Sequence, residues 1–96
     1  MQAVKRIEIV IDALELPRMI KLIEPLAPGY TVIQNVSGKG HRGERHADQI
    51  TSVLANAMIL IACAPEQVEP ITKAVRPLLK AFGGLCLVSD AQSLLH

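Results

Sequence analysis

The chain has 96 residues, half of them hydrophobic, and its ten basic and nine acidic residues leave a formal net charge of +1. This length supports a single domain, residues 1–96, with one modest core. A charge so close to zero argues against nucleic-acid binding, and only Tyr30 and Phe82 are available for base stacking. There is no signal-peptide pattern and no apolar run near the ~20 residues that span a bilayer, so we expect a cytoplasmic protein that is not transmembrane.

The first third of the chain predicts a strand, a helix and a second strand. Residues 4–12 are rich in isoleucine and valine, as strands are. Residues 16–24 have apolar side chains at helical spacing, and the prolines and glycine within residues 25–29 end this helix. Residues 30–36 alternate and are rich in β-branched side chains, which predicts the second strand.

After a long polar connection, the second half repeats this order. Residues 57–64 are eight apolar residues in succession, typical of a strand buried on both faces. Residues 66–82 predict an amphipathic helix with a kink at Pro77, ended by the glycine pair at 83–84. Residues 85–89 predict the fourth strand, and Asp90 is a suitable N-cap for one last helical turn in the tail.

The resulting order, βαββαβ, is that of the ferredoxin-like α+β sandwich, in which two helices cover one face of the sheet. Because residues 57–64 are apolar on both faces, the uncovered face would expose a large hydrophobic patch in a monomer. We therefore expect an oligomer. Cys63 and Cys86 fall within apolar strand segments and lack a CxxC spacing, which predicts two reduced core residues.

Residues 37–46, directly after the second strand, concentrate the side chains suited to an anion. Their three glycines allow backbone N–H groups to approach an anion closely, and Lys39, Arg42 and Arg45 supply positive charge. The whole connection, residues 38 to about 56, is too long for a hairpin turn and indicates a functional segment, with room for a helical turn at 48–55. The alternative is a solvated loop whose charges only maintain solubility. Neither a P-loop nor a Rossmann glycine pattern is present, so phosphoryl transfer is not supported.

Metal binding and catalysis are weaker interpretations of the same segment. His41 and His46, with Glu44 or Asp48, could ligate zinc or copper, but no rigid element is predicted to hold them. The serines lack the context of a nucleophile elbow. We therefore expect no catalytic residue, no metal site and no enzymatic activity.

The glycine pair at residues 83 and 84 is a second candidate site element. It is expected to cap the preceding helix. Beside Arg76 and Lys80, it would also leave room and positive charge for a ligand at the end of the helix. The two interpretations are compatible.

Together these residues resemble the PII signalling superfamily, whose members form compact trimers and bind adenine nucleotides in clefts between subunits. The resemblance lies in Tyr30-Thr31-Val32 of the second strand, Gly38-Lys39-Gly40 at the start of the connection and Phe82-Gly83-Gly84-Leu85 after the second helix. It extends over residues 5–89. It implies that residues 37–56 correspond to the T-loop of the family and residues 82–85 to the end of its B-loop.

Within that superfamily, residues 38–45 look most like the PII-like branch linked to bicarbonate transport and carboxysomes, which carries a GKG-x-R-x-x-R pattern. The resemblance implies that Lys39, Arg42 and Arg45 hold phosphate. It also implies contacts from a wider set of residues, namely Thr31 near the base, Gly38, Gly40 and His41 through the backbone, and Gly83, Gly84 and Leu85 beside the adenine or ribose. The expected ligands are AMP, ADP or cyclic AMP, together with bicarbonate, and no prosthetic group.

Three departures from nitrogen-regulatory PII proteins bear on the ligand. Those proteins carry a modified tyrosine or serine at the loop tip, whereas the tyrosine here, Tyr30, falls in a predicted strand. They have a lysine after the B-loop glycine where this chain has Leu85, and a pair of arginines in a tail where residues 90–96 have none. These differences argue against the combination of ATP with 2-oxoglutarate and favour a ligand with fewer phosphates.

The resemblance implies a homotrimer that orders its loop around a nucleotide and so regulates a target protein. That target would be a bicarbonate transporter or a carboxysome-related component, which would bring the protein to the inner membrane. A metal-binding or metal-tolerance trimer of similar topology and a ligand-free interaction domain are the alternatives.

Overall fold

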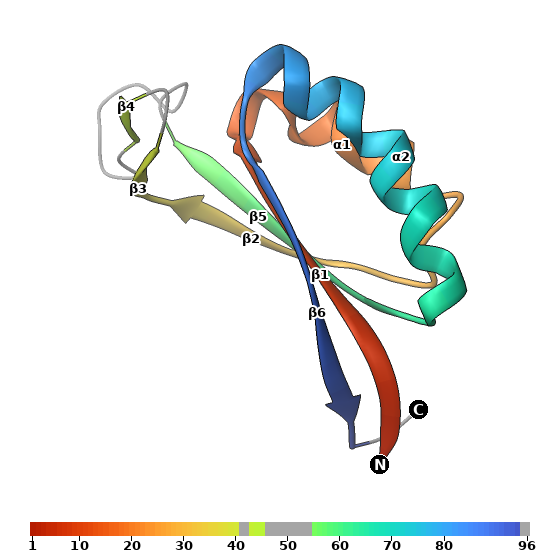
Figure 1. Ribbon diagram of the computed structural model, residues 1–96. Helices are drawn as coiled ribbons and strands as arrows, with labels where there is room; N and C mark the ends of the chain where they lie inside the picture. The colour runs from red at the N-terminus through yellow and green to blue at the C-terminus, as the bar shows by residue number, and fades with distance from the viewer. Residues whose placement is uncertain (41–42, 46–54, 95–96) are drawn as a thin grey trace.

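The computed structural model in Figure 1 describes residues 1–40, 43–45 and 55–94. Its elements in chain order are β1 (Gln2–Asp12), the 3₁₀ turn η1 (Ala13–Glu15), α1 (Leu16–Ile23), β2 (Thr31–Val36), β3 (Gly38–Gly40), β4 (Gly43–Arg45), β5 (Asn56–Cys63), α2 (Pro65–Phe82) and β6 (Leu85–Ser93). An antiparallel sheet has the strand order β2-β5-β1-β6, and both helices cover one of its faces (Figure 1). The predicted βαββαβ sandwich is confirmed.

The core is aliphatic and lies between the sheet and the two helices. Alternate residues of the two central strands face the helices, so each strand contributes every second side chain. The fully buried side chains of largest volume are Ile7, Ile9, Ile11, Met19, Ile23, Ile59, Ile61, Ile71 and Val75. Neither aromatic residue of the chain is among them, because Tyr30 and Phe82 both remain more than a third exposed.

Helix α2 runs as one helix from Pro65 through both internal prolines, Pro70 and Pro77, so neither proline ends it. At its start, the Ala64 N–H donates a hydrogen bond of 2.9 Å to Oε1 of Gln67. At its end, Gly83 lies in the left-handed region, and its N–H donates to the Leu79 carbonyl at 2.8 Å. The predicted glycine cap is confirmed.

Strand β6 is longer than the predicted segment 85–89, and the prediction of a helical turn capped by Asp90 was wrong. Asp90 lies within β6, directly opposite Lys5 of β1, and the two side chains form an ion pair. The neighbouring strand provides backbone partners as far as Ser93, so the chain stays extended. In the sequence alone, an aspartate within a strand cannot be told from an aspartate that caps a helix, so the local pattern gave the wrong prediction.

The long predicted connection lies between β2 and β5, and part of it is regular. Strands β3 and β4 pair as a small antiparallel ribbon, with Gly38 opposite Arg45 and Lys39 opposite Glu44. This ribbon was not predicted. The helical turn expected over residues 48–55 falls almost entirely outside the described residues.

The face of the sheet that the helices leave open carries a continuous apolar row. Ile33, Met58, Val10 and Leu85 are consecutive partners across β2, β5, β1 and β6. Ile33 is 44% exposed and Leu85 50% exposed, and Leu87 lies two residues further along β6 on the same face. A continuous exposed apolar row of this kind indicates a protein–protein interface.

Both cysteines are free, as predicted. Cys63 is buried, and burial raises the pKa of its thiol, with a smaller contribution from the charge of Glu66. Burial likewise raises the pKa of the Cys86 thiol. Both thiols are therefore protonated near neutral pH and are poor nucleophiles.

Candidate functional site

Two segments singled out in the sequence leave the same end of the sheet. Val36, the last residue of β2, pairs with Asn56, which in turn pairs with Asp12 at the end of β1. The neighbouring β6 begins at Leu85, opposite Val10. The β3–β4 ribbon and the Gly83–Gly84 turn therefore lie at the same end of the sheet (Figure 1), next to its two outermost strands β2 and β6, which are three strand spacings or roughly 14 Å apart.

The glycine turn is fixed by backbone contacts. Gly83 has φ +80° and Gly84 has φ +121°, conformations that residues with a side chain rarely adopt. A Cβ atom on Gly84 would lie 2.5 Å from the Val10 carbonyl oxygen and 3.0 Å from Cδ2 of Leu79. Both glycines are thus needed to bring the end of α2 directly against β1.

Positive charge gathers near this turn, as the sequence predicts. Arg76 and Lys80 are exposed on the last turns of α2, and neither has an ion-pair partner within residues 1–40, 43–45 and 55–94. The end of a helix carries partial negative charge, which repels a phosphate. These two cations offset that repulsion beside the turn.

The ribbon contributes the second half of this edge. Gly38 and Lys39 open β3, and Arg45 closes β4. A Cβ atom on Gly38 would meet nothing within 4 Å, so the space beside this glycine is open to a ligand. His41 and Arg42, which the sequence also assigned to the site, lie outside the described residues.

Thr31 does not join these segments within one chain. It starts β2 and pairs with Leu60, whereas the ribbon follows Val36 at the opposite end of that strand. Their partners on β5, Leu60 and Asn56, are four residues apart, which places the two positions about 13 Å from each other along the sheet. Thr31 is exposed on the open face of the sheet, where a second protomer could bring it to the site.

Tyr30, the one tyrosine, lies just before β2 rather than inside it. Its hydroxyl donates a hydrogen bond to Oε2 of Glu24 at 3.2 Å. Loss of solvent contact raises the pKa of the Tyr30 phenol, and the hydrogen bond and charge of Glu24 raise it further. This tyrosine is tied to the end of α1 and is not part of the loop.

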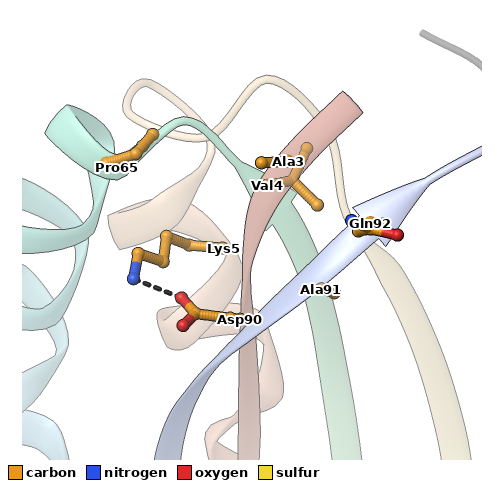
Figure 2. Close-up of a pocket in the computed structure, with 7 residues that line it drawn as sticks. All are labelled: Ala3, Val4, Lys5, Pro65, Asp90, Ala91 and Gln92. Atoms are coloured by element: carbon orange, nitrogen blue, oxygen red, sulfur yellow. Dashed lines mark hydrogen bonds and ion pairs between the residues drawn. The ribbon is translucent and has the colours of Figure 1, made fainter. Parts of the chain in front are cut away.

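Figure 2 shows a hollow of about 490 Å³ at the far end of the β1–β6 pair, away from the glycine turn. It is lined by Ala3, Val4, Lys5, Pro65, Asp90, Ala91 and Gln92. The charges of Lys5 and Asp90 are directed at each other, as the dashed line marks. This hollow lacks the unpaired cations that the opposite edge provides.

Two negative findings concern the part of the chain that the structure describes. It contains no cluster of three histidine, cysteine, aspartate or glutamate residues able to hold a metal ion. His46 and Asp48, two of the metal ligands considered above, are outside it. No helix in the same part of the chain is long and apolar enough to cross a membrane.

A family model described as nitrogen regulatory protein P-II matches residues 4–94. The chain belongs to the PII family. PII proteins are non-enzymatic signalling proteins, so the expectation of a signalling role without catalysis is confirmed. No functionally curated protein sequence matches the chain.

Solved structures place the chain among PII-like proteins. A structure of CPII from Thiomonas intermedia K12, a nitrogen regulatory PII-like protein bound to ADP, AMP and bicarbonate, is 28% identical and superposes with a TM-score of 0.86, covering 95% of this chain and 88% of that chain. A second CPII structure, bound to ADP and bicarbonate, has the same identity and coverage and a TM-score of 0.82. The Bacillus subtilis GlnK–ATP complex is 19% identical with a TM-score of 0.67, covering 95% of this chain and 84% of that chain, and shows the shared fold alone.

Proposed function

We propose that this PII-like protein binds an adenine nucleotide carrying few phosphates, ADP, AMP or cyclic AMP, in clefts between its subunits. The observation that carries the proposal is that the basic ribbon and the glycine turn both lie at the same end of the sheet, next to its two outermost strands β2 and β6. CPII, which has the same fold, binds ADP and AMP. Lys39, Arg42 and Arg45 would hold the phosphates, with Gly38, Gly40 and His41 presenting backbone groups.

The residues at the Gly83–Gly84 turn support the proposed preference for a nucleotide with fewer phosphates than ATP. Leu85 follows the glycines and is 50% exposed, but its side chain offers no charge. The nearby cations Arg76 and Lys80 belong to α2 and not to the turn itself. A triphosphate with a dicarboxylate beside it carries more negative charge than a diphosphate or monophosphate, and the uncharged Leu85 leaves it without a matching cation in the turn.

The functional unit in this proposal is a homotrimer. Thr31 lies about 13 Å along the sheet from the end of β2 at which the ribbon begins, so in this proposal it reaches the nucleotide from a neighbouring protomer. The apolar row on the open face supplies the surface that three copies would bury against one another. An intersubunit cleft then combines the ribbon and glycine turn of one protomer with Thr31 of the next.

Signalling would follow from the connection between β2 and β5. Nucleotide phosphate pairs with the cations of this connection and selects one conformation of it, which presents or hides a surface for a target. Bicarbonate, a small anion, would bind near Arg42 or Arg45, as CPII structures contain both bicarbonate and nucleotide. We propose a cytoplasmic protein whose target belongs to inorganic-carbon transport or carboxysome metabolism.

Removing either arginine is expected to weaken nucleotide binding strongly. Each charge-assisted hydrogen bond contributes about 1.5–3 kcal/mol, so Arg42→Ala or Arg45→Ala should raise the Kd for ADP about ten- to 150-fold. Isothermal titration calorimetry of each variant, with and without bicarbonate, measures this change. The fold should be unaffected, as monitored by circular dichroism.

Lys73→Ala is the matched control, because Lys73 is an exposed cation on the outer face of α2, remote from the open face of the sheet. It removes the same charge and should leave the Kd unchanged. Equal ADP affinity in wild-type protein and both arginine variants would overturn the assignment of these residues.

A further inference from the structure

A chain of contacts connects the two halves of the proposed site through η1 and the start of α1. The Ala13 N–H donates a hydrogen bond of 3.0 Å to the carbonyl of Ala55, the residue at which the long connection rejoins the sheet. The Leu14 N–H donates to Oδ1 of Asp12 at 2.9 Å, which fixes the entry into η1. This short turn therefore contacts the base of the ligand-binding connection.

The other end of η1 reaches the glycine turn through Arg18. Its Nη1 lies 3.3 Å from Oε1 of Glu15, whose side chain is only 13% exposed. The guanidinium carbon of Arg18 lies 5.6 Å from the centre of the Phe82 ring. Phe82 is the last residue of α2 and directly precedes the turn.

Arg18 contacts an aromatic ring that lies outside the hydrophobic core. Phe82 is 38% exposed and does not belong to the buried aliphatic cluster. The turn beyond it is anchored on its far side by the close approach of Gly84 to the Val10 carbonyl. On the helix side, the guanidinium of Arg18 lies over the Phe82 ring.

The ion pair with Glu15 stabilises the position of the Arg18 side chain. Oε1 of Glu15 is out of contact with water and makes no hydrogen bond among the described residues. An ionised carboxylate buried in this way needs a nearby positive charge, which the guanidinium provides. The same guanidinium, whose side chain is 67% exposed, thus contacts both Glu15 and the Phe82 ring.

We propose that Arg18 is a positioning residue, which holds the last turn of α2 and the glycine turn in their ligand-binding geometry and links them to the base of the connection at Ala55. Arg18 does not touch the ligand in this proposal. It acts through Phe82, and its effect on nucleotide affinity rests on the proposed function. Its effect on the glycine turn is independent of the proposed function, because the contacts of Arg18 with Glu15 and Phe82 exist in the chain without ligand.

The first test uses hydrogen exchange in the ligand-free protein. The Gly83 amide is protected by its bond to Leu79, and a cation–π contact at an exposed site should change this protection about two- to fivefold. We expect Arg18→Ala and Phe82→Leu each to accelerate exchange at Gly83 by this factor, while the Ile9 and Ile59 amides in the central strands stay unchanged. A general loss of stability would accelerate all three.

The second test measures ADP affinity by calorimetry. Arg18→Ala and Phe82→Leu should each raise the Kd about two- to fivefold, the double variant should add nothing further, and Arg18→Lys should restore part of the affinity because it keeps the cation. Lys21→Ala, an exposed cation one turn further along α1, is the control and should have no effect.

The two proposals fail in different ways. If the wild-type protein binds none of the nucleotides, the proposed function fails, and exchange at Gly83 still decides the role of Arg18. Unchanged Gly83 exchange in Arg18→Ala, or the same acceleration in Lys21→Ala, would overturn the positioning role even if ADP binds tightly.

Discussion

Glutamate in place of Met58 is expected to dissociate the proposed trimer and abolish nucleotide binding in one step. Met58 lies in the apolar row of the open face, between Ile33 of β2 and Val10 of β1. A carboxylate placed there would be buried without a partner on assembly, and the penalty of several kcal/mol per ion would recur in each protomer. Sedimentation should detect single chains in place of three-chain particles.

Binding should be lost with assembly because the site is divided between protomers. Thr31 is separated from the ribbon by the length of β2, so one chain alone cannot surround a nucleotide. Lys73→Glu changes the charge by two on the outer face of α2 and should leave both assembly and ADP affinity intact. A Met58→Glu protein that remains trimeric, or a monomer that binds ADP with wild-type affinity, would contradict the intersubunit site.

Alanine at position 84 is expected to be the most damaging small substitution in the chain. The left-handed φ of +121° costs about 1–3 kcal/mol for a residue with a side chain. The added Cβ also meets the Val10 carbonyl, a backbone atom that cannot move aside, and such overpacking costs about 1–3 kcal/mol more. We expect Gly84→Ala to lower the free energy of unfolding by about 2–6 kcal/mol in urea titrations.

Gly29→Ala separates this effect from a general intolerance of glycine replacement. A Cβ on Gly29 meets no atom within 4 Å, so this variant should be unchanged or more stable by up to about 1 kcal/mol. All variants must be compared at one protein concentration, because assembly adds to apparent stability. A Gly84→Ala protein as stable as wild type would mean that the turn does not require a glycine.

The strands and helices were predictable because their apolar periods are local. Ile7, Ile9 and Ile11 alternate along β1, and the helical spacing of apolar residues in α2 persists over its whole length. The same patterns predict only two helices, which cover one face of the sheet and leave the other face open. The fold and the need for a partner surface therefore follow from the order of the residues alone.

The features that sequence reasoning missed depend on contacts between distant segments. The β3–β4 ribbon consists of glycines and charged residues, which show no apolar period. The extension of β6 through Asp90 exists because Lys5 and its neighbours on β1 provide partners. Neither the ribbon nor the extension of β6 is indicated by the pattern of the residues that form it.

The site itself was only partly predictable. The basic segment and the glycine pair are visible in the sequence, but their placement at the same end of the sheet is a consequence of the strand order β2-β5-β1-β6. Arg18 carried no signal at all, because its role depends on Phe82 at the far end of another helix. The resemblance assigned Thr31 to the nucleotide, but its place at the end of β2 opposite the ribbon became visible only in the structure.

Calorimetric titration of the wild-type protein with ADP, AMP, cyclic AMP and ATP, each with and without bicarbonate, and with ATP in the presence of 2-oxoglutarate, tests the central claim most directly. We expect saturable binding of one nucleotide per protomer, tighter for ADP, AMP or cyclic AMP than for ATP with 2-oxoglutarate. Absence of binding by all four nucleotides, or tightest binding of ATP in the presence of 2-oxoglutarate, would contradict it.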